Sequence, residues 1–316
     1  MDSTSIHRLN ADRPLRYYRK LLWVGLNLFN NRLLPNASGQ NLVIRDFIAD
    51  TSDEKWCQTD IKSSPSRKLS DLFWLQLPWG WIKSELGSIN ILDTGCGSGD
   101  YGVKLQSFSN GRITSYTGVD IAPNDNWQVL TDAHPNFRFH TMRGEQVLDR
   151  IPEETNFIMS QSAIEHFEND LLYFKNLREF IRQKSSGIVQ VHLFPSAACL
   201  FLYRLHGVRQ YTPRTVSSIT RLFEPFSYSV LFRLGGRQCN SLHKEFITKP
   251  VYIRNIEDSR DTRTEEYDSR LREAIANDNA SQRREAAFYA LVIHSHYREK
   301  FFENADSHDA KMDSHS

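Results

Sequence analysis

Short apolar runs alternate with longer segments of helical periodicity through the middle of the chain. Ile89, Ile91 and Leu92 form one such run, of the kind that becomes a strand covered on both faces of a sheet. Helical patterns follow at 100–108 and 170–184. Further strands are predicted at 116–121, 137–142, 156–160 and 187–193. This alternation predicts a parallel sheet with right-handed crossovers.

The pattern changes after the fifth strand. Two strand-like stretches, 227–233 and 246–254, are separated by a linker that contains a Gly-Gly pair and is too short for a crossover helix. We expect them to form an antiparallel pair at the edge of the sheet. The predicted fold class is therefore α/β, with a Rossmann-like, seven-stranded, mostly parallel sheet and an antiparallel edge strand.

Helical extensions are expected on both sides of this core. The loop signals around Ser66 place the start of the α/β domain there. Beyond residue 258 the chain is strongly charged, with helices predicted at 265–276 and 282–302 and a polar tail at 307–316 that we expect to be disordered. The expected parts are an N-terminal extension at 1–65, a domain at 66–255 with an insert at about 195–225, and a C-terminal extension at 256–316.

The N-terminal extension contains a basic and aromatic stretch, 12–34, with a helical apolar pattern that Pro35 ends. Two interpretations remain open. The helix packs on the core, which Val24, Gly25 and leucines on two sides of the helix favour, or it makes a peripheral contact with an anionic membrane.

A glycine-rich turn follows the strand that contains Ile91. The strand ends at Asp93, and Gly95, Gly97 and Gly99 come next. Glycines let a backbone turn sharply and lie against a ligand, and the free N–H groups of the following helix face the same space. The segment 97–102 also matches the dinucleotide pattern G-x-G-x-x-G, but there the first glycine should follow the strand directly.

Read from Asp93, the order D-x-G-x-G-x-G resembles motif I of the class I S-adenosylmethionine-dependent methyltransferases. The next strand ends in Asp120, placed to accept hydrogen bonds from both ribose hydroxyls, although that chemistry also fits NAD. The segment from Ser160 to His166 is similar to the post-strand motif of many small-molecule methyltransferases. This resemblance covers about residues 66–255 and implies methyl transfer from S-adenosylmethionine.

The resemblance also implies which residues bind the donor. Glu145 is the candidate for the adenine amino group, with a solvated acid as the alternative. Arg67 or Lys68 would meet the donor's carboxylate, with an exposed basic residue as the alternative. Trp127 either stacks on adenine or packs in the core. The expected cofactor-binding residues are Asp93, Gly95, Cys96, Gly97, Gly99, Asp120, Ile121, Glu145, Ser160 and Gln161.

A hydroxyl acceptor requires a base near the transition state, and histidine most often supplies it. The candidates are His166, His192 and His206. His206 lies in the 195–225 insert, where we expect Arg209 and Tyr211 to help select the acceptor. The string from His192 to Tyr211 resembles methyltransferases associated with bacterial surface-polysaccharide synthesis, which makes a sugar hydroxyl the leading acceptor.

Composition narrows the function. The formal charge of +1 is too small to attract nucleic acid by long-range electrostatics. A small molecule or saccharide is therefore the expected partner. The four cysteines lack the spacing of a zinc site or disulfide framework, no metal-ligand spacing is evident, and no signal peptide or membrane span is recognised, so a cytoplasmic location is expected. A catalytically inactive partner subunit and an NAD-binding Rossmann protein remain the alternatives, and the oligomeric state is open.

Overall fold

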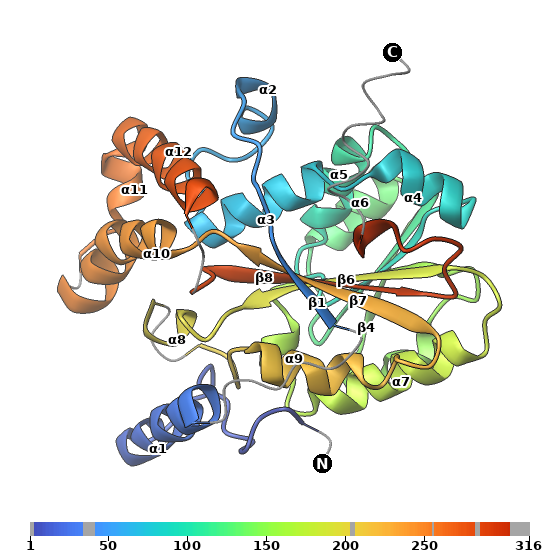
Figure 1. Ribbon diagram of the computed structural model, residues 1–316, viewed down its shortest axis with the longest axis horizontal. Helices are drawn as coiled ribbons and strands as arrows, with labels where there is room; N and C mark the ends of the chain where they lie inside the picture. Colours follow the sequence, from blue (N-terminus) through green and yellow to red (C-terminus); the bar gives the residue numbers. More distant parts are fainter. Residues whose placement is uncertain (1–2, 34–41, 203–205, 255, 282–284, 304–316) are drawn as a thin grey trace.

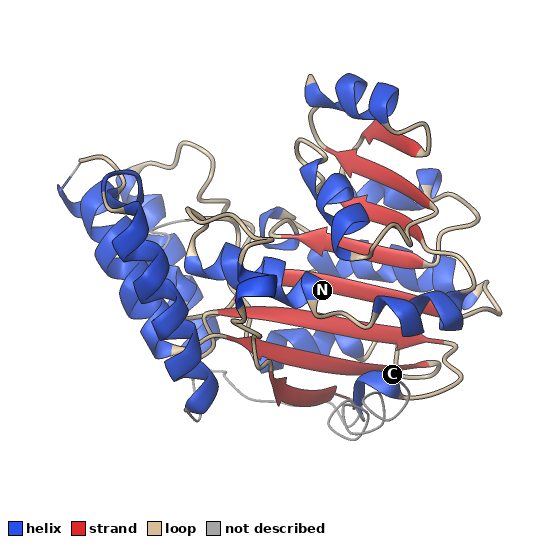
Figure 2. Ribbon diagram, turned by 90° about the horizontal axis from the view of Figure 1, so that it is seen from above, coloured by secondary structure: helices blue, strands red, loops and turns tan. Residues whose placement is uncertain are grey.

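The protein is built on one twisted sheet whose strands lie side by side (Figures 1 and 2). The computed structural model describes residues 3–33, 42–202, 206–254, 256–281 and 285–303. Within them the strand order is β1-β7-β8-β6-β5-β2-β3-β4. The strands are β1 (Leu42–Asp46), β2 (Asn90–Thr94), β3 (Ser115–Asp120), β4 (Phe137–Thr141), β5 (Phe157–Gln161), β6 (Ile188–Pro195), β7 (Ser227–Leu234) and β8 (Phe288–Ser295).

The sheet is mostly parallel, as predicted, and the fold is Rossmann-like. Of its strands, β8 alone runs antiparallel to its neighbours, which are β6 and β7. It lies inside the sheet, because β7 and then β1 continue the sheet beyond it. With β1, the sheet has eight strands, whereas seven were predicted. Since β1 and β8 lie outside residues 66–255, the sheet extends past both boundaries expected for the catalytic domain.

Two predictions near the C-terminus are wrong. Residues 246–254 do not form a strand but belong to the π-helical segment η4 (Lys244–Arg254). The predicted helix at 282–302 instead contains β8, all eight residues of which are buried. The apolar residues of β8 follow one another without interruption, as in a central strand that is buried on both faces. Ala290 and Leu291 favour helices, but this local preference is weaker than the burial of the strand. Within the described residues, helices but no strand lie between β7 and β8.

Helices cover both faces of the sheet (Figure 1). One face carries α3 (Pro65–Leu75), α4 (Trp79–Leu86), α5 (Asp100–Phe108), α6 (Asn126–Ala133), α10 (Arg237–His243) and α12 (Thr264–Ala280). The opposite face carries α7 (Asp170–Arg182) and α9 (Pro213–Thr220). The shorter helices are α2 (Asp53–Trp56), α8 (Cys199–Leu202), α11 (Ser259–Thr262) and the 3-10 turns η2 (Gly144–Arg150), η3 (Ile164–His166) and η5 (Phe301–Glu303).

The predicted N-terminal helix is confirmed as α1 (Tyr17–Leu28), which continues into the π-helical turn η1 (Phe29–Leu33). Figure 1 shows α1 at the periphery, apart from the sheet. Within the described ranges, no helix combines the length and the apolar character needed to cross a bilayer. The predicted disorder at 307–316 lies outside the described residues.

Candidate active site

The glycine-rich turn connects β2 to α5 and is shaped by its neighbours. Gly95 has a φ of +81°, and a Cβ there would lie 2.3 Å from the Cβ of Ala163. At Gly97, by contrast, nothing lies within 4 Å of the corresponding Cβ position, so this part of the turn faces open space. The Gly97 N–H donates to Oδ2 of Asp120 at 2.8 Å. The turn is therefore tied to the end of β3 and open on its outer side.

Trp127 packs beside this turn and is hydrogen-bonded to it. Its indole N–H donates to the carbonyl oxygen of Gly97 at 2.8 Å, and its ring stacks on Phe139 with centroids 5.3 Å apart. Because Trp127 is buried in this packing, its ring is not available to stack on an adenine. Of the two interpretations that the sequence left open for this residue, the structure favours packing.

Three cavities meet at the carboxyl ends of β2, β3, β5 and β6. Gly95 lines the first and the second, Arg67 the second and the third, and Ser162 the first and the third. Their volumes are about 400, 350 and 140 Å³. Such adjoining hollows at strand ends are the usual ligand site of an open α/β sheet.

The first cavity contains the residues expected at the adenosine end of a donor. Asp120 lines it from the end of β3, and Ile121 projects beside it with 67% of its surface exposed. Glu145 lines the same cavity and accepts a hydrogen bond from the Asn169 N–H at 3.4 Å. The other lining residues are Asn10, Arg13, Gly95, Val119, Met142, Arg143, Gly144, Ser162, Ala163, His166, Phe167 and Glu168.

The second cavity combines a buried acid with a nearby cation. Asp93 accepts a hydrogen bond from the Tyr116 hydroxyl at 2.6 Å through Oδ2, whereas Oδ1 has no hydrogen-bond partner among the described residues. Burial raises the pKa of Asp93 to about 7. Arg67 lines the same cavity, with its guanidinium over the ring of Tyr101 at 5.3 Å. Both an ammonium and a carboxylate group would therefore find partners here.

Of the other residues expected to bind the donor near the second cavity, some line it and some do not. Cys96 and Gln161 line it, and burial raises the pKa of the Cys96 thiol, which therefore stays protonated. Lys68 does not contribute, because its buried ammonium donates to Thr59 at 2.7 Å. Gly97 also lines the second cavity, whereas Gly99 and Ser160 line none of the three.

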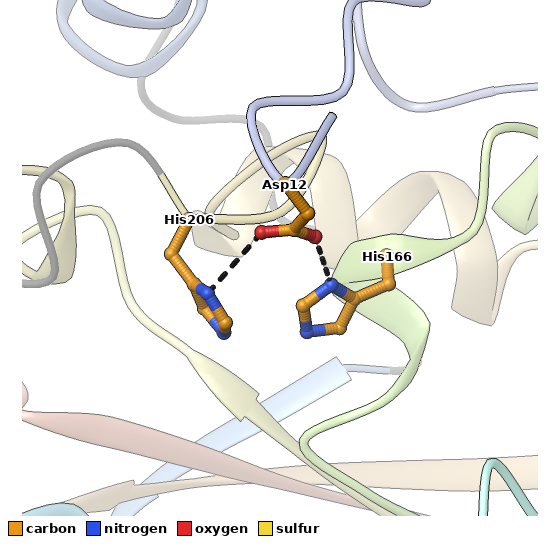
Figure 3. Close-up of side chains that lie close together, drawn as sticks. All are labelled: Asp12, His166 and His206. Carbon is orange, nitrogen blue, oxygen red and sulfur yellow. Dashed lines mark hydrogen bonds and ion pairs between the residues drawn. The ribbon is translucent and has the colours of Figure 1, made fainter. Parts of the chain in front are cut away.

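Two of the three candidate histidines come together with an acid from the N-terminal segment (Figure 3). Oδ2 of Asp12 lies 2.5 Å from Nδ1 of His166, and Oδ1 lies 3.3 Å from Nδ1 of His206. The two imidazole rings meet edge to face with centroids 4.6 Å apart. The Gly207 N–H also donates to Asp12, at 2.9 Å. His166 lines the first cavity and His206 the third.

Burial and charge shift the proton affinities of this cluster. Burial lowers the pKa of His166, but the hydrogen bond to Asp12 and the nearby Glu165 outweigh it, so the pKa is raised. Burial raises the pKa of Asp12, but the bonds from His166, His206 and the Gly207 N–H hold it well below its usual range. Burial also raises the pKa of Glu165, whose Oε1 lies 4.0 Å from Nε2 of His166. The cluster therefore pairs an acid whose pKa is lowered with an imidazole whose pKa is raised, and Glu165 lies close by.

The third candidate, His192, lies in the core. Its Nδ1 is 2.8 Å from the Ser160 hydroxyl, and both side chains are fully buried. Burial lowers the pKa of His192 to about 3. It lines none of the three cavities, so neither His192 nor Ser160 reaches a ligand bound there.

Arg209 and Tyr211 do not reach the acceptor side either. Arg209 is buried, lies 3.5 Å from the Asp170 carboxylate and donates to the carbonyl oxygen of Ile164. The Tyr211 hydroxyl donates to the same carboxylate at 3.0 Å. The expectation that these two residues select the acceptor is therefore wrong, because both anchor the insert to the start of α7.

Asp12 was not predicted as a site residue. It lies 154 positions from His166, in a segment expected to be an extension. Three contacts hold this segment in place: Thr4 donates to Asp170, Arg13 pairs with Glu168, and the Ala11 N–H donates to the Gly207 carbonyl. Asn10 and Arg13 thereby become part of the first cavity. In the sequence, Asp12 begins a basic and aromatic stretch, which does not indicate a ligand.

The same cluster has the ligand types of a metal site. Asp12, His166 and His206 each offer one ligand atom, and these atoms lie within 4.8 Å of one another. Two histidines and one carboxylate suit zinc or another transition metal. The spacing in the sequence did not reveal this group. In the structure the carboxylate of Asp12 hydrogen-bonds both imidazoles, so a metal would have to replace those bonds.

Comparisons with known proteins find similarity in fold only. No protein-family model matches the chain, and no curated protein matches its sequence. A putative sarcosine dimethylglycine methyltransferase from Galdieria sulphuraria is similar with a TM-score of 0.48 and 15% identity, over 79% of this chain and 93% of that one. A SAM dependent methyltransferase from Archaeoglobus fulgidus gives a TM-score of 0.43 and 17% identity, over 77% and 100%. The plantazolicin methyltransferase BamL gives 0.45 and 12%, over 77% and 94%. The function proposed below rests on the residues of the site.

Proposed function

We propose that the protein transfers a methyl group from S-adenosylmethionine to a hydroxyl group of a small molecule, with a saccharide as the leading acceptor. The observation that carries this proposal is that three cavities adjoin: two are lined by the glycine turn, and the third shares Arg67 and Ser162 with them. One has the acid and apolar side chains suited to a nucleoside, one the charges suited to an amino acid, and one a histidine that is bonded to an acid.

The residues of the first two cavities fit the donor. Asp120 uses one oxygen to accept the Gly97 N–H, and a carboxylate has further lone pairs for ribose hydroxyls. Ile121 offers an apolar surface to a base, and Glu145 an acceptor for an amino group. In the second cavity, Arg67 would bind the carboxylate of the donor, and the unpartnered Oδ1 of Asp93 would accept from its ammonium group.

When bound, the donor supplies an electrophilic methyl group on a positively charged sulfur. The protein aligns the acceptor with that methyl group and removes the proton of its hydroxyl. We assign proton removal to His166, whose Nε2 lies 4.0 Å from Oε1 of Glu165, a residue that lines the third cavity. With Nδ1 protonated and donating to Asp12, Nε2 of His166 is the basic nitrogen, and Asp12 stabilises the imidazolium that forms. His206 holds the second oxygen of Asp12 and thereby fixes the carboxylate.

The third cavity suits a hydroxylated acceptor with an apolar face. It is lined by polar groups from Ser64, Ser66, Ser162, Arg67, Glu165 and His206, and by the apolar side chains of Pro195 and Phe288. Alternating hydroxyl and ring C–H groups of a sugar would match this lining. The loose resemblance of the insert to methyltransferases of surface-polysaccharide synthesis supports the same acceptor class.

Calorimetry on the purified protein tests the donor. Binding of S-adenosylmethionine and S-adenosylhomocysteine without binding of NAD is expected, and the reverse result would establish the dinucleotide alternative. Transfer of a radiolabelled methyl group to a panel of mono- and oligosaccharides then tests the acceptor. Donor binding without transfer to any hydroxyl compound would instead favour the inactive partner subunit.

A further inference from the structure

The outward side of α1 is apolar and uncovered by any described part of the chain. Tyr17, Tyr18, Leu21 and Leu22 are between 52% and 78% exposed, and Phe29 at the end of the helix is 46% exposed. At 3.6 residues per turn these side chains lie on one continuous arc of the helix. Large apolar residues that are grouped in this way mark a surface that contacts another apolar phase.

The opposite side of α1 holds the helix to the protein. Trp23 and Asn27 are buried there, and the amide nitrogen of Asn27 lies 3.0 Å from Nε2 of His7. The indole of Trp23 meets the ring of His7 edge to face at 6.4 Å. A narrow buried side thus sets the orientation of the helix, and its apolar arc points outward. Of the two interpretations that the sequence left open for this helix, the outward arc favours a contact with a membrane.

Positive charge surrounds the apolar arc. Residues 13–45 contain no aspartate or glutamate. On the helix itself, Arg19 borders one edge of the arc and Lys20 the other, as the helical periodicity places them. Arg16, Arg19 and Lys20 are exposed and form no ion pair within the described residues. An apolar arc with cations at its edges is complementary to a bilayer that contains anionic lipid.

We propose that α1 is a docking helix for anionic phospholipid membranes, with its apolar arc in the interface and its basic residues at the lipid headgroups. The segment that leads into α1 carries Asp12 to His166, so docking would hold the active site close to the membrane surface. An acceptor saccharide that is linked to a lipid would then be presented at the cavity. The docking itself does not depend on the proposed methyl transfer.

Co-sedimentation of the full-length protein with vesicles tests this proposal. Vesicles of phosphatidylcholine and of phosphatidylcholine mixed with phosphatidylglycerol are compared at low and high salt. We expect binding to the anionic vesicles that weakens with salt, and much weaker binding to the neutral ones. Leu21→Glu combined with Leu22→Glu should lower the partition coefficient about tenfold or more, because two apolar side chains leave the interface.

Two further variants sharpen the result. Arg19→Gln combined with Lys20→Gln should lower binding to anionic vesicles and reduce its salt dependence. Val129→Glu is the matched control, since Val129 is an equally exposed apolar residue on α6, and it should bind like the wild type. Thermal unfolding and donor binding verify that each variant is folded.

The proposal is overturned if the wild type does not sediment with anionic vesicles, or if the leucine variant binds as well as the wild type. It is also overturned if light scattering shows a dimer that the leucine variant dissociates, because a second copy of the chain would then cover the arc. None of these readouts uses methyl transfer, so failure here is distinct from failure of the proposed activity.

Discussion

The carboxylate of Asp12 lies 2.5 Å from Nδ1 of His166, although 154 positions of sequence separate the two residues. This contact makes the N-terminal segment part of the candidate active site. It also raises the pKa of the imidazole and fixes which of its nitrogens carries the proton.

Removing the base should abolish most of the turnover. We expect His166→Ala to lower kcat by about 10²–10⁴-fold, the usual contribution of general-base catalysis, with little change in donor affinity. Asp12→Asn should lower kcat less and shift the rising limb of the pH–rate profile to lower pH, because the pKa of His166 loses its support. Full activity in His166→Ala would remove this residue from catalysis, and loss of activity in His206→Ala alone would transfer the role to His206.

The pair should also stabilise the fold within a limited pH window. The raised pKa of His166 means that its contribution is present below about 6.5 and is lost as the pH rises through the raised value. The lowered pKa of Asp12 means that its contribution is present above about 3.8 and is lost as the pH falls. In urea denaturation, the difference in free energy of unfolding between wild type and Asp12→Asn should therefore peak at about pH 5–6. A difference independent of pH would contradict the ion pair.

Two ligands distinguish the residues that bind the amino-acid end of the donor from those that bind its ribose. Arg67→Gln should weaken binding of S-adenosylhomocysteine by about tenfold or more, because a charged partner of the carboxylate is lost. It should leave binding of 5′-methylthioadenosine, which has no carboxylate, unchanged. Asp120→Ala should weaken both ligands by about 1–3 kcal/mol, because both contain the ribose. Calorimetry with both ligands checks the assignment, and equal losses for both ligands in Arg67→Gln would contradict it.

Metal chelation distinguishes the two chemistries open to the histidine cluster. We expect EDTA to leave turnover unchanged, because Asp12 is bonded to both imidazoles and no ion is needed to hold them. Added Zn²⁺ should inhibit, since it would occupy Nδ1 of His166 and displace the proton there. If EDTA abolished turnover and Zn²⁺ restored it, the cluster would be a metal centre.

The buried ion pair of the insert should matter for stability. Arg209→Ala leaves the Asp170 carboxylate buried without its cation, which typically costs about 3–5 kcal/mol. Tyr211→Phe removes one hydrogen bond to the same carboxylate and should cost about 1 kcal/mol. Urea denaturation measures both. A change in the Michaelis constant of the acceptor without loss of stability would return these residues to the acceptor site.

Local patterns were sufficient for much of the fold. The helix predicted at 100–108 is confirmed, and so is the strand around Ile91, although it runs one residue past Asp93 to Thr94. Their apolar periodicity and the glycines between them agree with the burial that the sheet imposes. At 288–295 the local pattern was ambiguous. A continuous apolar run fits a buried helix as well as a buried strand, and only its place between β6 and β7 resolves the choice.

The site was predictable where the chemistry lies within one turn and hidden where it is assembled from distant segments. The glycine turn and Asp120 could be read because they follow consecutive strands. Asp12 could not, since no periodicity connects residue 12 with residue 166. The sequence also did not show whether the side chain of His192 is exposed. It is buried because Phe174 of α7 packs against its ring.

Because β8 lies inside the sheet, the sheet can be completed only late in synthesis on the ribosome. Strand β1 pairs with β7, and β7 reaches the rest of the sheet only through β8, which is the last strand of the eight to be made. Until residue 288 has been made, β1 and β7 have no strand that connects them to the rest of the sheet, and the third cavity lacks the wall that Phe288 provides. The residues of the glycine turn are therefore synthesised well before the third cavity can be complete.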